Sequence, residues 1–298
     1  MKSDFKNYLY IFIAGCLWGT VSIFVKSMDA AGSSTGYTSF LRVFFGFLIL
    51  ALITLIKEGP QAFRINKQTL IACILLGIFT QGFFNISYNT AIGYIGASLG
   101  AVLLYTAPLF TSVMSFFLFK EKITRTKALA LLINIIGCAF TVTGGHFNAI
   151  TFSVIGVCWG VAAGFFYSLG AILGTYTSGQ ASSLVVTTYN FLFASIFLGI
   201  SLRPWSSVQT PFDLKLLLLG IAYAIIPTAL AYSIYFTGVQ RVKETSKIPI
   251  AASIETVSAT IVGILVFHET LGFGNLLGIA LVLASIVIMN LKFKKTSE

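Results

Sequence analysis

Ten apolar runs, each close to the length that crosses a lipid bilayer, dominate this 298-residue sequence. An α-helix rises about 1.5 Å per residue, so roughly 20 apolar residues span the hydrocarbon core of a bilayer. A soluble domain covers its core with a charged surface, whereas only 9% of these residues are charged and 57% are hydrophobic. The sequence therefore predicts an all-α integral membrane protein with no separate soluble domain.

Short segments separate the runs, so several neighbouring helices must be antiparallel. YIGAS lies between the third and fourth runs, and HETLG lies between the ninth and tenth. We predict ten transmembrane helices in total. They cover residues 8–27, 36–56, 69–91, 97–119, 126–144, 151–174, 183–202, 214–236, 246–267 and 272–291.

The net charge of +10 reflects topology and does not indicate a nucleic-acid partner. With the N-terminus in the cytoplasm, the cytoplasmic segments hold 15 of the 19 basic residues, and such a bias sets orientation. We therefore expect a multi-pass protein of the cell (plasma or inner) membrane, in contact with the lipid bilayer, with both termini cytoplasmic. The 15 residues are Lys2, Lys6, Lys57, Arg64, Lys67, Lys120, Lys122, Arg125, Lys127, Arg241, Lys243, Lys247, Lys292, Lys294 and Lys295.

The sequence offers little for catalysis or for metal binding. All four cysteines lie inside predicted spans without metal-ligand spacing, and His146 and His268 lie near span ends. No glycine-rich phosphate loop and no nucleophile with a base is present in the sequence. We expect no catalytic residue, no cofactor and no metal. A channel is disfavoured because the sequence has no ring of acids and no selectivity motif.

The two halves of the sequence resemble each other in architecture. A shift of 148 residues lays Ser98 on Ser246, Phe119 on Phe267 and Glu121 on Glu269. Five spans per unit is an odd number, so the second unit must enter the membrane from the opposite side. The sequence predicts two inverted five-helix repeats, residues 1–147 and 148–298, an arrangement typical of transporters.

Five motifs follow one another in a recognisable order: CLWGT, TSFLRVFF, YNTAIGYIGAS, LYTAPLFTSVMSFFLFKEKIT and ASIETVSATIVGILVFHETLG. With them the chain resembles the drug/metabolite transporter superfamily and, within it, the EamA-like transporters. The resemblance implies a ten-helix carrier of small metabolites, often an exporter, with a central cavity formed by both repeats. Thr256 stands where many relatives have a proline, so the resemblance does not fix whether the ninth helix bends.

Arg42 and Glu255 are charges inside otherwise apolar spans. A charge at the centre of such a helix costs about 2.5–3.5 kcal/mol on insertion scales. The repeat alignment pairs Arg42 with Asn190 and Glu255 with Ala107, so each charge exists in one half only, as an asymmetric substrate site requires. Arg42 lies roughly 9 Å from the end of its span, close enough for its side chain to reach the interface instead.

Glu255 lies near the predicted midplane, where its short side chain cannot reach either interface. Three roles are open to it: binding a cationic group of the substrate, carrying a coupling proton, or neutralising Arg42. If Arg42 binds a carboxylate and Glu255 an amine, the substrate is a small polar or zwitterionic metabolite, an amino acid or a related compound. Organic cations or drugs are the alternative.

Further polar and aromatic residues are candidates for the wall of a substrate cavity. A single tyrosine of this kind more often packs between helices or lies at an interface, whereas the group suits stacking against rings or cations. The oligomeric state and the coupling ion stay open. The candidates are Trp18, Gln81, Asn85, Tyr88, Tyr105, Tyr167, Tyr189, Asn190, Tyr232 and Tyr235.

Overall fold

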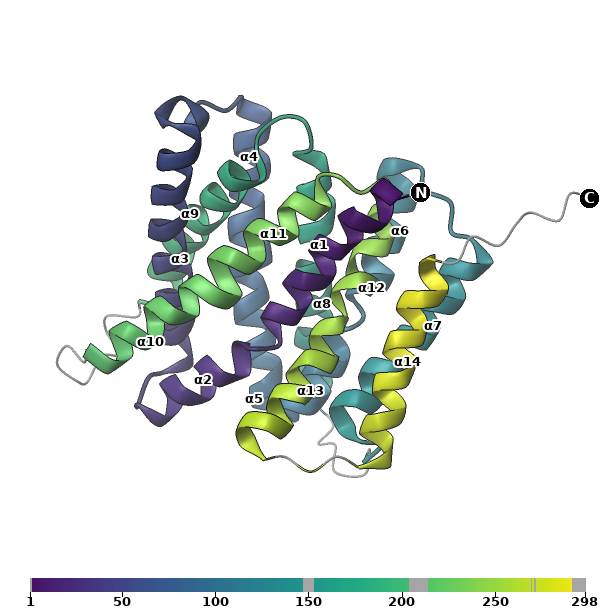
Figure 1. Cartoon of the computed structure of the whole chain (residues 1–298). Coiled ribbons are helices and arrows are strands. Elements are labelled where there is room, and N and C mark those ends of the chain that lie inside the picture. The colour runs from purple at the N-terminus through teal and green to yellow at the C-terminus, as the bar shows by residue number, and fades with distance from the viewer. Residues whose placement is uncertain (1, 147–152, 204–213, 269, 271, 291–298) are drawn as a thin grey trace, which may run out of the picture.

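The computed structural model describes residues 2–146, 153–203, 214–268, 270 and 272–290, and every regular element in this part is helical (Figure 1). The first half contains α1 (Lys2–Trp18), α2 (Val21–Ala30), α3 (Thr35–Glu58), η1 (Pro60–Phe63), α4 (Lys67–Leu75), η2 (Leu76–Phe83), α5 (Phe84–Leu104), α6 (Ala107–Phe119) and α7 (Arg125–Thr143). The second half contains α8 (Val154–Tyr176), α9 (Ser183–Leu202), α10 (Leu214–Ala224), η5 (Ile225–Leu230), α11 (Ala231–Val239), η6 (Thr245–Lys247), α12 (Ile248–Ala252), α13 (Ile254–Phe267) and α14 (Phe273–Asn290).

Nine helical stretches in the described part are long and apolar enough to cross a membrane. The tenth predicted span corresponds to a shorter apolar helix, Phe273–Met289. The prediction of an all-helical, multi-pass membrane protein is therefore confirmed. The nine stretches are Lys6–Ala30, Thr35–Glu58, Lys67–Ala97, Leu99–Phe119, Arg125–Thr143, Val154–Tyr176, Ser183–Leu202, Leu214–Val239 and Thr245–Phe267.

Local sequence signals explain where several helices begin and turn. The Ser34 hydroxyl accepts the backbone N–H of Tyr37 at 3.2 Å and so caps α3. Asn66 caps α4 in the same way, through the N–H of Thr69 at 2.7 Å. Gly96, in the predicted YIGAS turn, has φ of 78°, a left-handed conformation that glycine adopts without strain. The chain reverses there between the third and fourth spans.

The long helices are interrupted at matching places in the two halves. η2 and η5 are π-helical, and each lies in the middle of the third span of its half. α6 follows a break at Tyr105, and α13 follows a break at Ser253, 148 residues later. π-helical segments within α-helices are rare and often mark functional sites. The matching interruptions therefore indicate that a functional site lies in the middle of the bundle.

The ninth span bends although no proline follows Glu255. The Ser253 hydroxyl donates to the carbonyl of Ile250 at 2.7 Å, and the Thr256 hydroxyl donates to the carbonyl of Ser253 at 2.8 Å. Such local hydrogen bonds compete with the regular helical ladder. The break at Ser253 therefore lies between two local hydrogen bonds made by hydroxyl side chains.

The helices pack in pairs, with α7 along α14, α5 along α8 and α3 along α9 (Figure 1). The largest buried cluster joins α1, α11 and α12 around Phe236 and Ile250. Large apolar side chains lie on the outside of the bundle, including Leu265 at 72% exposure and Phe273 at 82%. An outer surface of this kind suits lipid better than water.

Gly278 sets the close approach of α14 to α7. A Cβ added at this position would lie 2.7 Å from the backbone carbonyl carbon of Phe140, which cannot rotate away. We expect Gly278→Ala to lower the thermal midpoint of the purified protein by roughly 5 °C, because overpacking forces the two helices apart. Gly93→Ala is the control, since its added Cβ meets no side chain and no other helix within 4 Å in the described part of the chain. Equal midpoints for the two variants would contradict this account.

Candidate functional site

A cavity of about 530 Å³ lies between the helices of the two halves. We call the end of the bundle that holds Lys6 and Glu121 the N-side end, and the end that holds Asp29 and His268 the opposite end. The cavity extends from Glu255 to Lys26 and Asp29, two exposed residues of α2, so it opens at the opposite end. Eight residues predicted from sequence line its wall: Trp18, Arg42, Asn85, Tyr88, Tyr105, Tyr167, Tyr232 and Glu255.

One face of α3 supplies a polar stripe to the cavity. Thr35, Thr38, Ser39 and Arg42 follow the spacing i, i+3, i+4, i+7, which places them on one side of a helix, and all four line the cavity. An adjacent side of α3 packs against α9 through buried Val43 and other apolar residues. α3 therefore presents Arg42 to the cavity and an apolar face to its neighbour.

The Arg42 side chain is held within the bundle, 7% exposed. Its Nη2 donates a hydrogen bond to Oε1 of Gln81 at 3.0 Å, and its guanidinium lies 5.6 Å from the ring centroid of Tyr223. The backbone carbonyl of Gln81 accepts from Asn85 at 2.5 Å, which joins the cavity wall to the π-helical segment η2. The Nε atom of Arg42 has no hydrogen-bond partner in the described part of the chain. Arg42 therefore lies toward the cavity, and its Nε–H group can donate a hydrogen bond to a bound molecule.

Glu255 lies in the first turn of α13, directly after the break at Ser253. The helix N-terminus there favours a negative charge. Within the described residues, the Glu255 carboxylate makes no hydrogen bond and no ion pair, with Arg42 or with any other group, although it lines the cavity. A carboxyl group in an enclosed site needs a proton, a hydrogen bond or a cation. The cavity therefore contains an acid that can take up a proton or bind a cationic group of a molecule in the cavity.

An aromatic cluster adjoins Glu255. The Trp18 ring lies 5.0 Å from that of Tyr232, 5.1 Å from that of Tyr235 and 6.5 Å from that of Tyr167, measured between centroids. The indole Nε1 of Trp18 is buried and has no hydrogen-bond partner among the residues that the structure describes. Aromatic faces of this kind attract cations and stack on rings.

Four of the predicted site residues do not line the cavity. Gln81 lies behind Arg42, and Tyr235 lies behind Trp18, so both support residues that do line it. Tyr189 lies toward the N-side end, where its hydroxyl donates to the carbonyl of Phe63 at 2.8 Å. Asn190 is fully buried in α9, and its amide atoms have no partner among the described residues.

Tyr223 lines the cavity beside Arg42, and the sequence did not point to it. It precedes Tyr232 by nine residues, roughly two and a half turns at 3.6 residues per turn, which would place the two rings on opposite faces of a regular helix. The π-helical segment η5 lies between them and changes this register. A helical-wheel argument therefore excludes Tyr223, although both tyrosines reach the same cavity.

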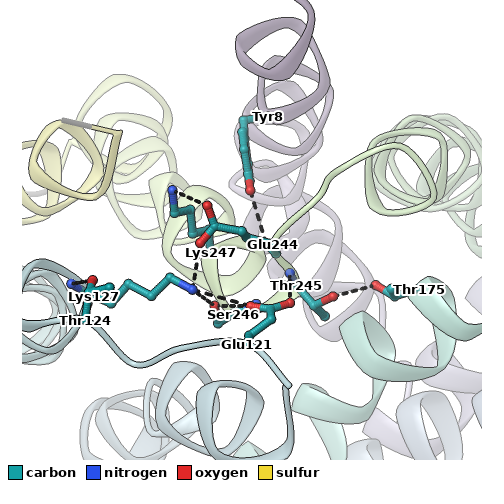
Figure 2. A network of polar contacts seen from close by, with 9 residues as sticks. All are labelled: Tyr8, Glu121, Thr124, Lys127, Thr175, Glu244, Thr245, Ser246 and Lys247. Atoms are coloured by element: carbon teal, nitrogen blue, oxygen red, sulfur yellow. Dashed lines mark hydrogen bonds and ion pairs between the residues drawn. The ribbon is translucent and has the colours of Figure 1, made fainter. Parts of the chain in front are cut away.

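The N-side end of the bundle is closed by a network of polar contacts (Figure 2). Glu121 accepts the backbone N–H of Thr245 at 2.6 Å, the backbone N–H of Ser246 at 3.2 Å and the Ser246 hydroxyl at 2.5 Å. The Lys127 ammonium donates to the Ser246 hydroxyl at 2.9 Å. It also lies 2.7 Å from a carboxylate oxygen of Glu244 and 3.5 Å from one of Glu121. The network ties the end of α6 and the start of α7 to the start of the ninth span.

Glu244 makes this network sensitive to pH. Burial raises the pKa of Glu244, but its hydrogen bonds with Lys127 and Lys247 outweigh burial and hold the pKa below its ordinary value. A lowered folded-state pKa stabilises the protein above the ordinary pKa of a glutamate, and this contribution is lost as the pH falls through the folded value. We expect Glu244→Gln to lower the thermal midpoint at pH 7. The difference in thermal midpoint between wild type and the variant should disappear as the pH falls below about 4, near the ordinary glutamate pKa. A difference in thermal midpoint that does not change with pH would contradict this role of Glu244.

Among the described residues, no three or more His, Cys, Asp or Glu side chains lie close enough together to hold a metal ion. The site therefore consists of one acid, one guanidinium, an aromatic cluster and a polar helix face around an open cavity. This composition suits reversible binding of a small polar molecule.

Known proteins share this architecture. The EamA-like transporter family matches the chain twice, over residues 5–143 and 154–291. An uncharacterized transporter of Archaeoglobus fulgidus is 30% identical over 283 residues, which cover 93% of this chain and 94% of that protein. The uncharacterized transporter YetK of Bacillus subtilis is 26% identical over 259 residues, 83% of this chain and 76% of YetK.

A protein of known crystal structure has the same fold, with a TM-score of 0.82 at 16% sequence identity, over 97% of this chain and 98% of that one. The two family matches together cover nearly the whole sequence, in agreement with the motifs of the first and second halves. The helices, the duplicated match and the relatives lead to one conclusion. The chain belongs to the EamA-like transporter family.

Proposed function

We propose that this protein is a carrier that moves a small polar or zwitterionic metabolite, an amino acid or a related compound, by alternating access around the central cavity. The observation that carries the proposal is the pair of charges in the cavity wall, Arg42 on α3 and Glu255 on α13, which form no ion pair with each other among the described residues. Arg42 would bind a carboxylate, and Glu255 would bind an amine or a coupling proton.

The ten spans are proposed to form two inverted repeats, residues 1–147 and 148–298. Besides the π-helical segments, α6 and α13 support this arrangement, since each ends at a left-handed residue, Lys120 with φ of 56° and His268 with φ of 53°. Inverted repeats exchange conformations as a carrier opens to one side and then to the other.

The N-side end is proposed to face the cytoplasm, because most basic residues outside the spans belong to segments at this end. Both termini are then cytoplasmic, and the cavity is open to the outside of a cell membrane. We infer export as the direction, from the resemblance to transporters that are often exporters. Substrate would load when the N-side end opens.

An organic cation is the second candidate for the substrate. It is favoured by the aromatic cluster around Trp18 next to the unpaired Glu255 carboxylate. The two candidates differ in their need for Arg42, since only a zwitterion has a carboxylate for the guanidinium.

A thermal-shift screen on purified protein separates the two. The panel would contain amino acids, the amines that lack their carboxylates, and larger organic cations. We expect amino acids to stabilise the wild type and to lose this effect in both Glu255→Gln and Arg42→Met. Stabilisation by cations that depends on Glu255 alone would favour the second candidate, and no stabilisation by any member would contradict the proposed site.

A further inference from the structure

Three hydroxyl side chains of α6 are buried without a partner. Thr111 and Ser115 are 0% exposed and Ser112 is 3% exposed, and none of their hydroxyls has a hydrogen-bond partner among the residues that the structure describes. Thr111 and Ser115 lie one helical turn apart, so the hydroxyls share one side of the helix. Buried polar groups are normally paired, so three unpaired hydroxyls on one helix require an explanation.

These hydroxyls lie in the part of α6 that runs from the cavity floor to the N-side end. A void of about 10 Å³ at the start of α6 is lined by Pro108, Ala252 and Glu255, so the chain leaves little open space below the carboxylate. From there α6 contacts α12 and η6, the first elements of the ninth span, as well as α8. We call the contact between α6 and residues Thr245–Ala252 the seam.

Glu121 holds the far end of this seam together. It lies just beyond α6, and its carboxylate accepts the two backbone N–H groups at the start of the ninth span, which have no partner within their own helix (Figure 2). A carboxylate is favoured there by the helix dipole and by charge-assisted hydrogen bonds. Lys127 is 7% exposed and contacts the Ser246 hydroxyl and Glu121 in the same place. The two halves of the chain thus meet through buried charges.

The three hydroxyls lie on the buried side of α6, the side that packs against α8 and the seam, and a purely structural contact would not leave them unpaired. Opening the seam would expose the three hydroxyls to water, which favours the open form, and the Glu121 contacts oppose this by favouring the closed form. The cavity opens at the opposite end in this structure, so a carrier that alternates between two openings needs a second one at the N-side end, and the seam lies between that end and the cavity floor. These features are typical of a gate with two states of similar free energy.

We propose that the seam is the N-side half of the substrate route and that Glu121, Ser246 and Lys127 form the latch that keeps it closed. The inference rests on the proposed carrier function and adds the path by which substrate reaches the N-side end. Thr111, Ser112 and Ser115 are the side chains that the substrate meets on this path. Opening requires loss of the hydrogen bonds that Glu121 makes to the backbone of Thr245 and Ser246.

Cysteine accessibility in membrane vesicles tests the latch without any substrate. Ser115→Cys is placed in a background with the four native cysteines replaced, and a membrane-impermeant thiol reagent is added from the N-side or from the opposite side. We expect slow labelling in the parent, and roughly ten-fold faster labelling from the N-side when Glu121→Gln or Ser246→Ala is added, since each removes a charge-assisted hydrogen bond. Cysteine at Asn89, in the cavity wall, should become less accessible from the opposite side.

Glu58→Gln is the matched control. The Glu58 carboxylate also accepts a hydrogen bond from a serine that caps a helix, Ser182 at 2.6 Å, but this contact is exposed and lies outside the seam. We expect Glu58→Gln to leave both labelling rates unchanged. Unchanged labelling of Ser115→Cys in folded Glu121→Gln and Ser246→Ala would overturn the latch, as would equal acceleration by Glu58→Gln. Because no substrate is present, these outcomes are independent of whether Glu255 and Arg42 bind the proposed metabolite.

Discussion

Replacing Glu255 with glutamine is expected to have the largest effect on transport of any single change in the cavity. The amide keeps the size of the side chain but can neither balance a cationic group nor release a proton. If Glu255 binds the amine of the substrate, affinity should fall about 10- to 100-fold, the equivalent of one charge-assisted hydrogen bond. If Glu255 carries the coupling proton, flux should continue but lose its dependence on pH. Flux and binding are measured in proteoliposomes between pH 5 and pH 9.

Asp29→Asn is the control for this experiment, because Asp29 is an exposed acid at the cavity mouth. It should leave the affinity and the pH profile close to those of wild type. Unchanged affinity together with an unchanged pH profile in Glu255→Gln would show that Glu255 has a structural role only.

Replacing Arg42 is expected to separate substrates by whether they have a carboxylate. Arg42→Lys keeps the charge but loses the planar fork that matches a carboxylate, and Arg42→Met loses both. We expect binding of amino acids to weaken about 10- to 100-fold in Arg42→Met and by less in Arg42→Lys. Amines without a carboxylate should bind both variants as they bind wild type.

The contact between Arg42 and Gln81 adds a second effect to the Arg42→Met variant, which must be separated from the loss of carboxylate binding. Arg42→Met also removes the hydrogen bond between the guanidinium and Gln81, which weakens the cavity wall for all substrates alike. The exposed Lys122→Met serves as a control for the loss of a positive charge. Equal loss of binding for amino acids and for the corresponding amines would indicate that Arg42 supports the fold of the cavity without contacting a carboxylate.

The helices could be predicted from sequence because lipid-length apolar runs and short turns are strong local signals. The YIGAS turn is an example, since Gly96 adopts the left-handed backbone that reverses the chain between two spans. The spacing of Thr35, Thr38, Ser39 and Arg42 was also present in the sequence as a helix face, and it could have pointed to the α3 wall of the cavity.

Other parts of the site depended on interruptions that the apolar pattern does not show. A π-helical segment shifts Tyr223 onto the face of Tyr232. Pro227 in IIPTAL lacks a backbone N–H and so marks an interruption, but the apolar pattern does not show how far the register shifts. The break at Ser253 lies between two local hydrogen bonds made by hydroxyl side chains. Tyr189 was predicted from sequence to line the cavity, but its hydroxyl donates to the carbonyl of Phe63 in η1 and the residue does not line the cavity.

Substrate counterflow is the measurement that tests the carrier assignment most directly. Proteoliposomes are loaded with an unlabelled metabolite identified in the thermal-shift screen, and uptake of the labelled metabolite is followed with time. The account predicts saturable uptake that overshoots equilibrium, requires the internal metabolite and is strongly reduced in Glu255→Gln. Ohmic current without saturation, or chemical conversion of the metabolite, would contradict it.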